Sequence, residues 1–294
     1  MRFELLRDLE LLRRGWRWGE VRPRWPEPAA IPEPTDLEWS RAEPVRTLRR
    51  LVQEGLWLPF TRLMTRPQVE GEEWLRNPDR SMILVSNHVS HADTHVLLAA
   101  LPGRVRERTV IGAAADYWYR RPWLGRLVSF WLNTFPFARS GGARGVLHSS
   151  GRLLRSGWHL LIYPEGTRSP DGRLQEFKPG VGHLAGETRA PVLPIHVRGT
   201  HRVMPKGRRI PLPAPVQVRV GRPLYPEPGE TPRSFTRRVE RAVSELGDGS
   251  RAPEVAGSWI ERWRATAPAP RRPRPGSGWR TAAGAAEGGE RPHR

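Results

Sequence analysis

Residues 80–103 read RSMILVSNHVSHADTHVLLAALPG, and this stretch indicates the architecture of the domain around it. The segment MILVS, at 82–86, is a short apolar run of the length that a buried strand needs, so it predicts a strand. After a polar connection, residues 93–100 predict a helix, and Ser90 is suited to cap its amino end. A strand followed at once by a helix is the repeating unit of an α/β domain.

The same alternation of strand and helix patterns continues to about residue 220. Further strands are predicted at 109–113, 160–163, 192–197 and 216–220, and further helices at 145–155 and 235–246. Parallel strands need such crossover helices to return the chain. We therefore predict an α/β fold with a mostly parallel sheet flanked by helices, together with an N-terminal helical segment and a disordered C-terminal tail.

Composition divides the chain into three parts. Residues 1–44 join a segment of helical spacing, MRFELLRDLELLRRGW, to a Pro-rich linker, VRPRWPEPAAIPEPTD. Residues 45–247 are the predicted folded domain. From 248 to 294 the chain is rich in Ala, Pro, Gly and Arg, a composition that cannot bury a core, so we expect a disordered basic tail.

The segment EPVRTLRRLVQEGLWLPFTRLM, residues 43–64, predicts an amphipathic helix broken at Pro59. Arginines lie beside its apolar residues, and Trp57 and Phe60 flank the proline. A basic amphipathic helix with aromatic residues suits a membrane interface, whereas an apolar helical stripe also packs on the core of its own domain. The sequence leaves both interpretations open.

The chain is strongly basic, with 49 Lys and Arg against 30 Asp and Glu and a formal net charge of +19. This excess favours polyanionic partners: nucleic acid, an anionic membrane surface or phosphorylated small molecules. No nucleic-acid-binding motif accompanies the charge, so we expect no nucleic acid partner. There are no cysteines, which excludes disulfides, thiolate metal sites and a Cys nucleophile. No apolar run is long enough for a transmembrane helix, and the first residues do not resemble a signal peptide.

The cluster NHVSHADTH invites two interpretations. His88, His91, Asp93 and His95 are residue types that bind zinc, but the spacing matches no zinc-hydrolase pattern such as HExxH, and we expect no metal. Alternatively, His88 and Asp93 form a catalytic pair. His88 directly follows the strand, at the sheet edge where α/β proteins place their chemistry.

In that pair, Asp93 lies close enough along the chain to hydrogen-bond one imidazole nitrogen of His88. The other nitrogen is then free to take a proton from a hydroxyl group. No GxSxG nucleophile motif is present, so the hydroxyl would belong to the substrate. A His–Asp hydrogen bond that only holds a loop is the alternative.

A second polar loop, YPEGTRSPDGRLQEFKPG at 163–180, follows the strand predicted at 160–163. Gly166 permits close approach of a ligand to the backbone, Arg168 and Lys178 are cations suited to phosphate, and Thr167 adds a hydroxyl. The alternative is an ordinary turn with an ion pair between Glu165 and Arg168.

Four segments in this order, NHVSHAD, NTFPFAR, YPEGTRS and VLPI, resemble the four sequence blocks of the glycerolipid acyltransferases, the 1-acylglycerol-3-phosphate acyltransferase family. The resemblance covers roughly residues 81–224. It implies an α/β domain with an apolar groove for the acyl chain. It also implies transfer of a fatty acyl group from acyl-CoA or acyl carrier protein to a lyso-phospholipid hydroxyl, without a metal or other cofactor.

The resemblance implies a role for each matching position. His88 would be the general base and Asp93 its partner. The acceptor and its phosphate would contact Arg139, Glu165, Gly166, Thr167 and Arg168, with Lys178 as a further cation, and Pro194 would border the acyl-donor region. A lipid substrate and the basic charge imply peripheral attachment to an anionic membrane surface on its cytoplasmic side.

The chain departs from the family pattern upstream of the second block. A Lys-x-Glu-Leu-like element is expected there, but Ala114 or Ala115 stands at the lysine and Asp116 near the acid. The preferred acceptor is 1-acyl-sn-glycerol-3-phosphate, giving phosphatidic acid, and the departure keeps another lyso-lipid or a glycolipid open. A catalytically silent protein that binds lipid or membrane is the alternative from another class.

Overall fold

The computed structural model describes residues 34–76, 78, 80–137, 143–204 and 210–248. Two compact units are distinguished along the chain, 1–254 and 255–294, and the second contains no described residue. The predicted helix near the start, Arg139 and nearly all of the predicted tail also lie outside the described residues. The domain boundaries therefore stay predictions.

The described residues form one seven-stranded sheet in the order β1-β7-β6-β2-β5-β3-β4. Neighbouring strands are parallel except for the antiparallel pair β6 and β7. The mostly parallel sheet is thus confirmed. The strands are β1 Gln68–Glu70, β2 Ile83–Ser86, β3 Thr109–Ala114, β4 Thr134–Phe137, β5 His159–Ile162, β6 Val192–Arg198 and β7 Gln217–Val220.

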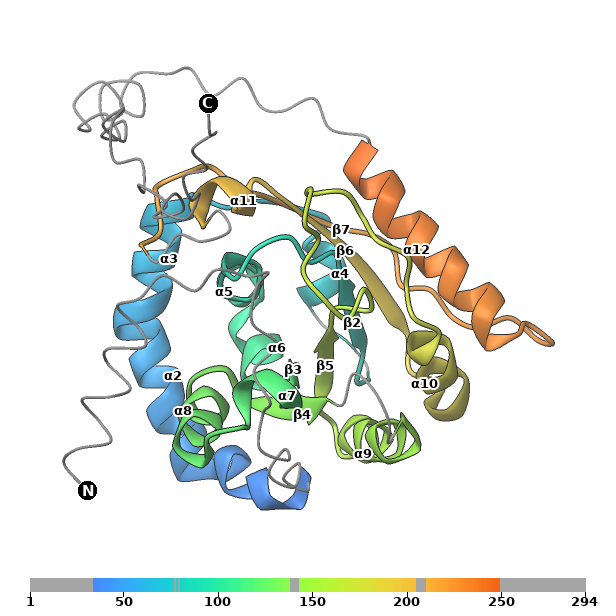
Figure 1. The fold of residues 1–294 in the computed structure, drawn as a ribbon, viewed down its shortest axis with the longest axis horizontal. Helices are drawn as coiled ribbons and strands as arrows, with labels where there is room; N and C mark the ends of the chain where they lie inside the picture. The colour runs from blue at the N-terminus through green and yellow to red at the C-terminus, as the bar shows by residue number, and fades with distance from the viewer. Residues whose placement is uncertain (1–33, 77, 79, 138–142, 205–209, 249–294) are drawn as a thin grey trace, which may run out of the picture. The chain divides into compact units, whose positions relative to one another are not determined.

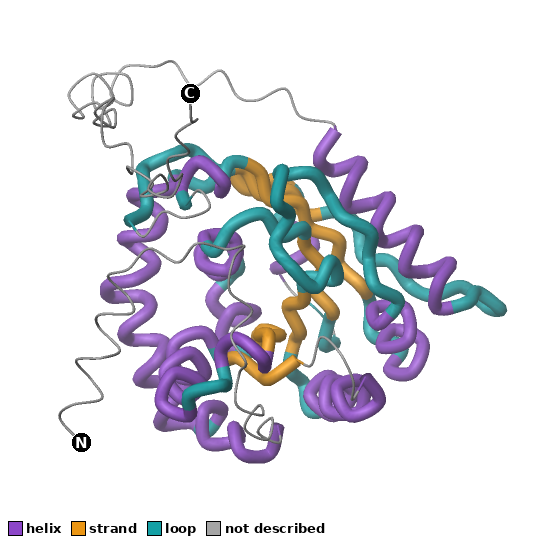
Figure 2. The backbone as a smooth tube through the Cα atoms, in the orientation of Figure 1, coloured by secondary structure: helices purple, strands orange, loops and turns teal. Residues whose placement is uncertain are grey.

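Helices cover both faces of the sheet (Figures 1 and 2). Alternate strand residues point to opposite faces. In β2, Ile83 and Val85 belong to the core shared with helices α9 Ala143–Arg155, α10 Gly180–Thr188 and α12 Pro232–Asp248. Leu84 belongs to the opposite core, which includes α4 Glu73–Arg76, α5 Ala92–Ala100, α6 Gly103–Glu107 and α11 Thr200–Val203.

The strands and helices expected from the sequence are found within a few residues of their predicted bounds. Several elements were not predicted: β1, β4, α4, α6, α10, α11, α7 Ala115–Trp118 and α8 Pro122–Leu132. Strand β4 reads TFPF, and a proline normally argues against a strand. It is tolerated here because β4 is at the edge of the sheet, where one side of the strand needs no hydrogen-bond donor.

The predicted break of the helix at Pro59 is wrong, because the chain stays helical through this position. A 3₁₀ helix, η1 Pro34–Arg41, leads into α2 Glu43–Val52, and the chain then stays helical through the π-helical turn η2 Gln53–Trp57 and α3 Leu58–Thr65. In the π turn the N–H of Leu58 donates to Gln53 O. Pro59 follows in the first turn of α3, where its missing N–H costs little, so the widened turn replaces a break.

The α2–α3 run buries two of its long polar side chains. Arg49 and Gln53 are buried and donate to the carbonyls of Phe130 (3.2 Å) and Trp131 (2.8 Å), which belong to the last turn of α8. Leu58 is buried, but five other apolar residues of the run are exposed, and Leu56 and Leu63 retain 66% and 67% of their accessible surface. The exposed members are Leu48, Leu51, Leu56, Phe60 and Leu63. These five side chains therefore do not pack on the domain's own core.

No described helix is both long enough and apolar enough to cross a membrane.

Candidate active site

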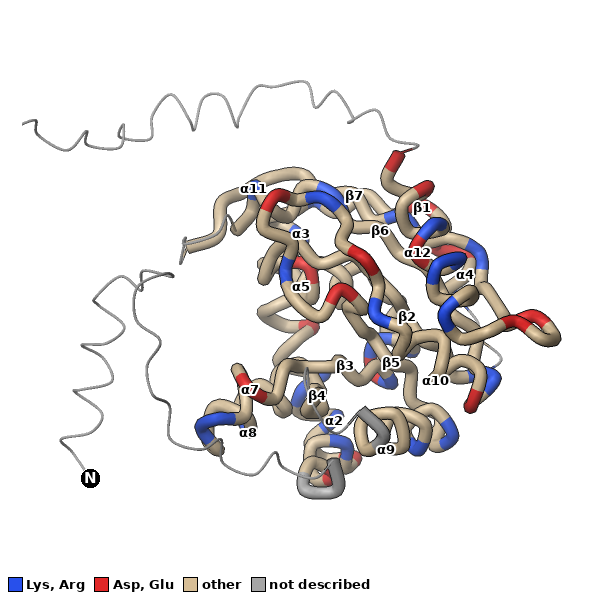
Figure 3. The backbone as a smooth tube through the Cα atoms, turned by 45° about the vertical axis from the view of Figure 1, so that its right-hand side comes forward, with Lys and Arg blue, Asp and Glu red and all other residues tan. Residues whose placement is uncertain are grey.

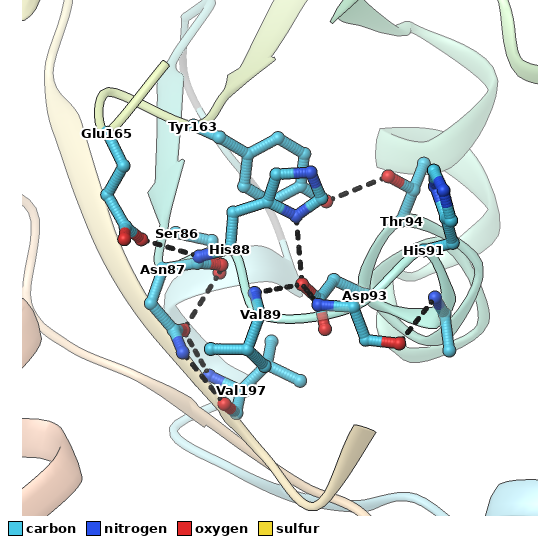
Figure 4. A network of polar contacts seen from close by, with 12 residues as sticks. Ser86, Asn87, His88, Val89, His91, Asp93, Thr94, Tyr163, Glu165 and Val197 are labelled. Atoms are coloured by element: carbon cyan, nitrogen blue, oxygen red, sulfur yellow. Dashed lines mark hydrogen bonds and ion pairs between the residues drawn. The ribbon is translucent and has the colours of Figure 1, made fainter. Parts of the chain in front are cut away.

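The cluster predicted from NHVSHAD assembles where β2 and β5 end (Figure 4). These neighbouring strands are parallel, so their carboxyl ends meet at one edge of the sheet. His88 follows β2, Asp93 is in the first turn of α5, and Tyr163 directly follows β5. The polar groups that the sequence separates by up to 77 residues are thus brought together by strand pairing.

His88 and Asp93 form the expected pair. His88 Nδ1 and Asp93 Oδ2 lie 2.9 Å apart. Asp93 is fully buried, and the same oxygen accepts hydrogen bonds from the backbone N–H groups of Val89 (2.7 Å) and Ser90 (2.8 Å). Because the carboxylate can only accept, the network assigns the imidazole proton to Nδ1. Nε2 is then the unprotonated nitrogen, as a general base requires.

Two side chains hold the loop that carries His88. Ser90 Oγ accepts a hydrogen bond from the Ala92 N–H (3.1 Å), so Ser90 satisfies a free donor of α5 although the cap position itself falls on His91. Asn87 makes both amide hydrogen bonds with the backbone of Val197 in β6, at 2.8 and 2.9 Å. Its side chain thus extends the pairing of β2 with β6 beyond the end of the strand.

Tyr163 is a site residue to which sequence reasoning gave no role. Its ring stacks on the His88 ring, with 4.1 Å between centroids and 18° between planes. Its hydroxyl lies 2.9 Å from Thr94 Oγ1 in α5. Burial, and then the charge of Asp93, raises the pKa of Tyr163 well above its ordinary value. Tyr163 is therefore a neutral platform that fixes the plane of the imidazole.

Glu165 locks the two polar loops together. Its buried carboxylate accepts hydrogen bonds from the backbone N–H of His88 (2.6 Å) and of Gln175 (3.1 Å). In return, the Ser169 N–H donates to the carbonyl of His88 (2.8 Å). Burial raises the pKa of Glu165 to about 7, against the opposing effect of the two hydrogen bonds. The alternative ion pair with Arg168 does not occur among the described residues.

Gly166 and the cations occupy the same loop. Gly166 has φ +73°, a conformation that favours glycine, and its N–H donates to Tyr163 O (3.0 Å). A Cβ at this position would lie 2.7 Å from Lys178 Nζ, so the ammonium group rests against the turn. Thr167 is exposed and Arg168 half-buried. Burial, and then the charge of Arg168, lowers the pKa of His91 to about 4.

The position of the expected family lysine is followed by two aromatic residues that lie near His91. Ala114 ends β3 and Ala115 begins α7, the short helix that also carries Asp116, Tyr117 and Trp118. The Tyr117 ring lies 6.5 Å from that of His91 and 4.9 Å from that of Trp118. An aromatic cluster thus stands next to the His88 loop.

Pro194 occupies the interior of the sheet. It is buried in β6, in register with Val85, and its carbonyl accepts a hydrogen bond from the Gly221 N–H (2.8 Å). No described contact joins it to His88, so its link to the acyl donor stays a prediction. The described residues contain no group of three or more side chains that could hold a metal ion.

Comparison with known proteins shows what the chain is similar to. Residues 66–198 match the model of the Acyltransferase family, a region that contains His88, Asp93 and the 163–169 loop. This confirms the resemblance to the glycerolipid acyltransferases that the four blocks indicated.

The particular relatives are 1-acyl-sn-glycerol-3-phosphate acyltransferases. A chloroplastic one from Brassica napus is 32% identical over 161 residues, which is 53% of this chain and 44% of the relative. The human alpha enzyme is 30% identical over 172 residues, 56% of each chain. The chain thus spans about half the length of the curated relatives it matches. The crystal structure of the acyltransferase PlsC from Thermotoga maritima is also similar, with TM-score 0.55, 25% identity and coverage of 74% of this chain and 89% of that one.

Proposed function

We propose that this protein is an O-acyltransferase. It moves a fatty acyl group from acyl-CoA or acyl carrier protein to the hydroxyl of a lyso-glycerophospholipid, and 1-acyl-sn-glycerol-3-phosphate is the leading acceptor. The observation that carries the proposal is the 2.9 Å pair of His88 Nδ1 and Asp93 Oδ2 within the region that matches the family. The relatives bearing the name of this activity support the choice of acceptor.

The proposed mechanism uses His88 as a general base. Its Nε2 removes the proton of the acceptor hydroxyl while the oxygen attacks the thioester carbonyl. As the tetrahedral intermediate collapses, the carbon–sulfur bond breaks, and the imidazolium returns the proton to the leaving thiolate. Asp93 stabilises the imidazolium in between. Positioned general-base catalysis contributes roughly 10²–10⁴-fold, so substrate orientation supplies much of the remaining acceleration.

The acceptor's phosphate is assigned to the loop that contains Gly166. Lys178 Nζ rests against this turn, and the same loop carries Arg168, whose charge lowers the pKa of His91. Glu165 is assigned a different role from the one inferred from the family. Its carboxylate is occupied by the backbone N–H groups of His88 and Gln175, so it positions the catalytic loop rather than contacting the acceptor.

A second acceptor class is favoured by one specific observation. Where the family pattern has a lysine, this chain has Ala114 or Ala115, and the rings of Tyr117 and Trp118 lie around that of His91. Aromatic faces suit apolar chains and sugar rings better than phosphate. Another lyso-lipid or a glycolipid is the alternative acceptor.

Peripheral attachment to an anionic membrane surface is part of the proposal. The α2–α3 run exposes five apolar residues, and the adjacent α8 exposes Trp123 and Leu127. An apolar helical face left outside the core, with arginines around it, fits an interfacial helix. The basic net charge favours the anionic cytoplasmic leaflet as its partner.

The test is an acyl-transfer assay read by lipid mass spectrometry. Purified protein receives acyl-CoA or acylated carrier protein with a panel of lyso-phospholipids and glycolipids, and His88→Ala runs in parallel. A product that depends on His88 supports the mechanism and identifies the acceptor. No product from any donor and acceptor, with folded protein and intact vesicle binding, would favour a silent lipid-binding protein instead.

A further inference from the structure

A separate cavity of about 780 Å³ lies at the amino-terminal edge of the sheet, opposite the edge that carries His88. Its lining includes the residues that lead into or begin three central strands: Ser81 before β2, Arg108 before β3 and His159 in β5. Ala190, shortly before β6, completes this floor. The volume is in the range of pockets that bind small molecules.

The cavity is strongly cationic. Its described lining contains seven arginines and one glutamate, and Figure 3 shows basic positions on α2 and α9, two of the contributing helices. Four of the arginines form no ion pair with any described residue. They are Arg80, Arg104, Arg108 and Arg189. Like charges held together without acidic partners repel one another, and a bound anion would relieve that repulsion.

Helix capping accounts for only part of this arrangement. Arg108 and Arg189 follow the last residues of α6 and α10, and Arg155 ends α9, so each is favourably placed near a helix carboxyl end. Arg104 also falls in the last turn of α6, which has only five residues. Arg80 has no such role, because it directly precedes the start of β2. The convergence of both groups on one cavity needs a further explanation.

The floor beneath the arginines contributes no charge. Val105, Leu154 and Ala190 are buried apolar residues of the lining. His159 Nδ1 accepts the Met82 N–H (3.1 Å), which requires an unprotonated nitrogen. Burial, and then the charge of Arg108, lowers the pKa of His159 to about 4, so the imidazole is neutral near pH 7. The cavity thus joins an uncharged floor to a cationic rim.

We propose that this cavity binds a soluble anion that carries several phosphate groups. Guanidinium groups pair with phosphate through two parallel hydrogen bonds, and arginines arriving from separate elements can satisfy more than one phosphate at once. A single carboxylate would leave most of them unpaired. This inference does not depend on the proposed acyl transfer.

A soluble ligand is favoured over a lipid headgroup by the geometry of α2. Arg46 is the residue of α2 that lines the cavity, and it also contacts the Trp158 ring. At roughly 100° per residue, Arg46 lies about 200° from Leu48 and about 140° from Leu51 around the helix axis. The exposed apolar face of α2 therefore points away from the cavity. A membrane that contacts this face would not meet the arginines.

Isothermal titration calorimetry of the full-length protein with tripolyphosphate tests the proposal, with orthophosphate as the weaker comparison. The cavity variant is Arg108→Gln/Arg189→Asn, in which Asn suits the positive φ of 53° at position 189. The control is Arg237→Gln/Arg241→Gln on the exposed side of α12, which removes the same charge. We expect saturable tripolyphosphate binding that weakens at least about tenfold in the cavity variant and little in the control.

Three results would overturn the proposal. One is no binding of tripolyphosphate at 0.15 M salt. Another is equal weakening in both variants, which would mean that net charge alone attracts the anion. The third is arginine-dependent binding to phosphatidic acid vesicles without binding of soluble polyphosphate. Circular dichroism and melting curves check that the variants fold. If the double variant does not fold, the test is repeated with the single substitution Arg104→Gln, at an exposed position of the same cavity.

Discussion

Replacing Asp93 by Asn tests whether the buried carboxylate supports catalysis by His88. The amide oxygen can keep the place of Oδ2, because three donors surround that position: His88 Nδ1, Val89 N–H and Ser90 N–H. The tautomer of His88 and the shape of the loop are then preserved, while the negative charge is lost. The variant therefore isolates stabilisation of the imidazolium from positioning of the ring.

The structure sets the size of the effect. Two unit charges 2.9 Å apart interact by about 6 kcal/mol at an effective dielectric constant of about 20. That corresponds to roughly 10⁴-fold in rate. The side chain of His88 is 20% exposed, and solvent screens part of this interaction. We therefore expect kcat to fall by about 10²–10⁴-fold.

The assay is steady-state acyl transfer at saturating donor and acceptor, with melting curves to verify folding. Asp171→Asn is the matched control, because Asp171 is an exposed aspartate in the 163–180 loop that contacts Ser169 and Arg173 rather than His88. It should retain activity within about threefold of the unsubstituted protein. A folded Asp93→Asn protein with more than a tenth of the original kcat would refute the role given to Asp93.

Three further predictions concern the loop, the acid stability and the membrane face. Gly166→Ala places a side chain at φ +73°, so denaturant titration should show that the free energy of unfolding falls by roughly 1–2 kcal/mol. Steady-state kinetics should show a raised KM for the acceptor. If both values are unchanged, the turn does not require glycine. The pKa values of His91, His159 and His196 are lowered to about 4, so the unfolded chain binds more protons between pH 4 and 6.5 and stability should fall on acidification there. Glu165, with its pKa raised to about 7, acts in the opposite direction between about pH 4.5 and 7, but it is one group against three. The melting temperature should change less steeply with pH in the His159→Asn variant, whose side-chain oxygen can still accept the Met82 N–H. Leu51→Glu/Leu63→Glu should abolish sedimentation with anionic vesicles without lowering the melting temperature. Ile210→Glu, a control at another exposed apolar residue, should bind vesicles as before. If the double variant still binds, the α2–α3 run is not the membrane-binding surface.

Local pattern was sufficient for the elements that are contiguous in the chain. The strand at 82–86 and the helix at 93–100 were predictable because the length and spacing of their apolar residues are visible along the chain. The same holds for the pair of His88 and Asp93, since five residues between a strand end and a helix start leave little freedom. The alternation of strand and helix patterns predicted the mostly parallel sheet, and the order of the four blocks predicted the resemblance to the acyltransferases.

Other features depended on contacts between distant segments. The stripe of leucines in α2–α3 is visible in the sequence, but whether it faces the core or the solvent depended on the carbonyls of α8 that hold Arg49 and Gln53 inside. Asn87 found its partner 110 residues away, in β6.

The candidate active site and the cationic cavity also depend on contacts between distant segments. The stacking of Tyr163 on His88 and the inward turn of Glu165 required β5 to pair with β2. Arg80, Arg108 and Arg189 of the cationic cavity come together because they precede parallel strands, whose starts share one edge of the sheet. The spacing of apolar and polar residues along the chain determines which local helices and strands form. Which side of a helix faces the core, and which distant side chains come into contact, is decided only when the helices and strands pack around the sheet.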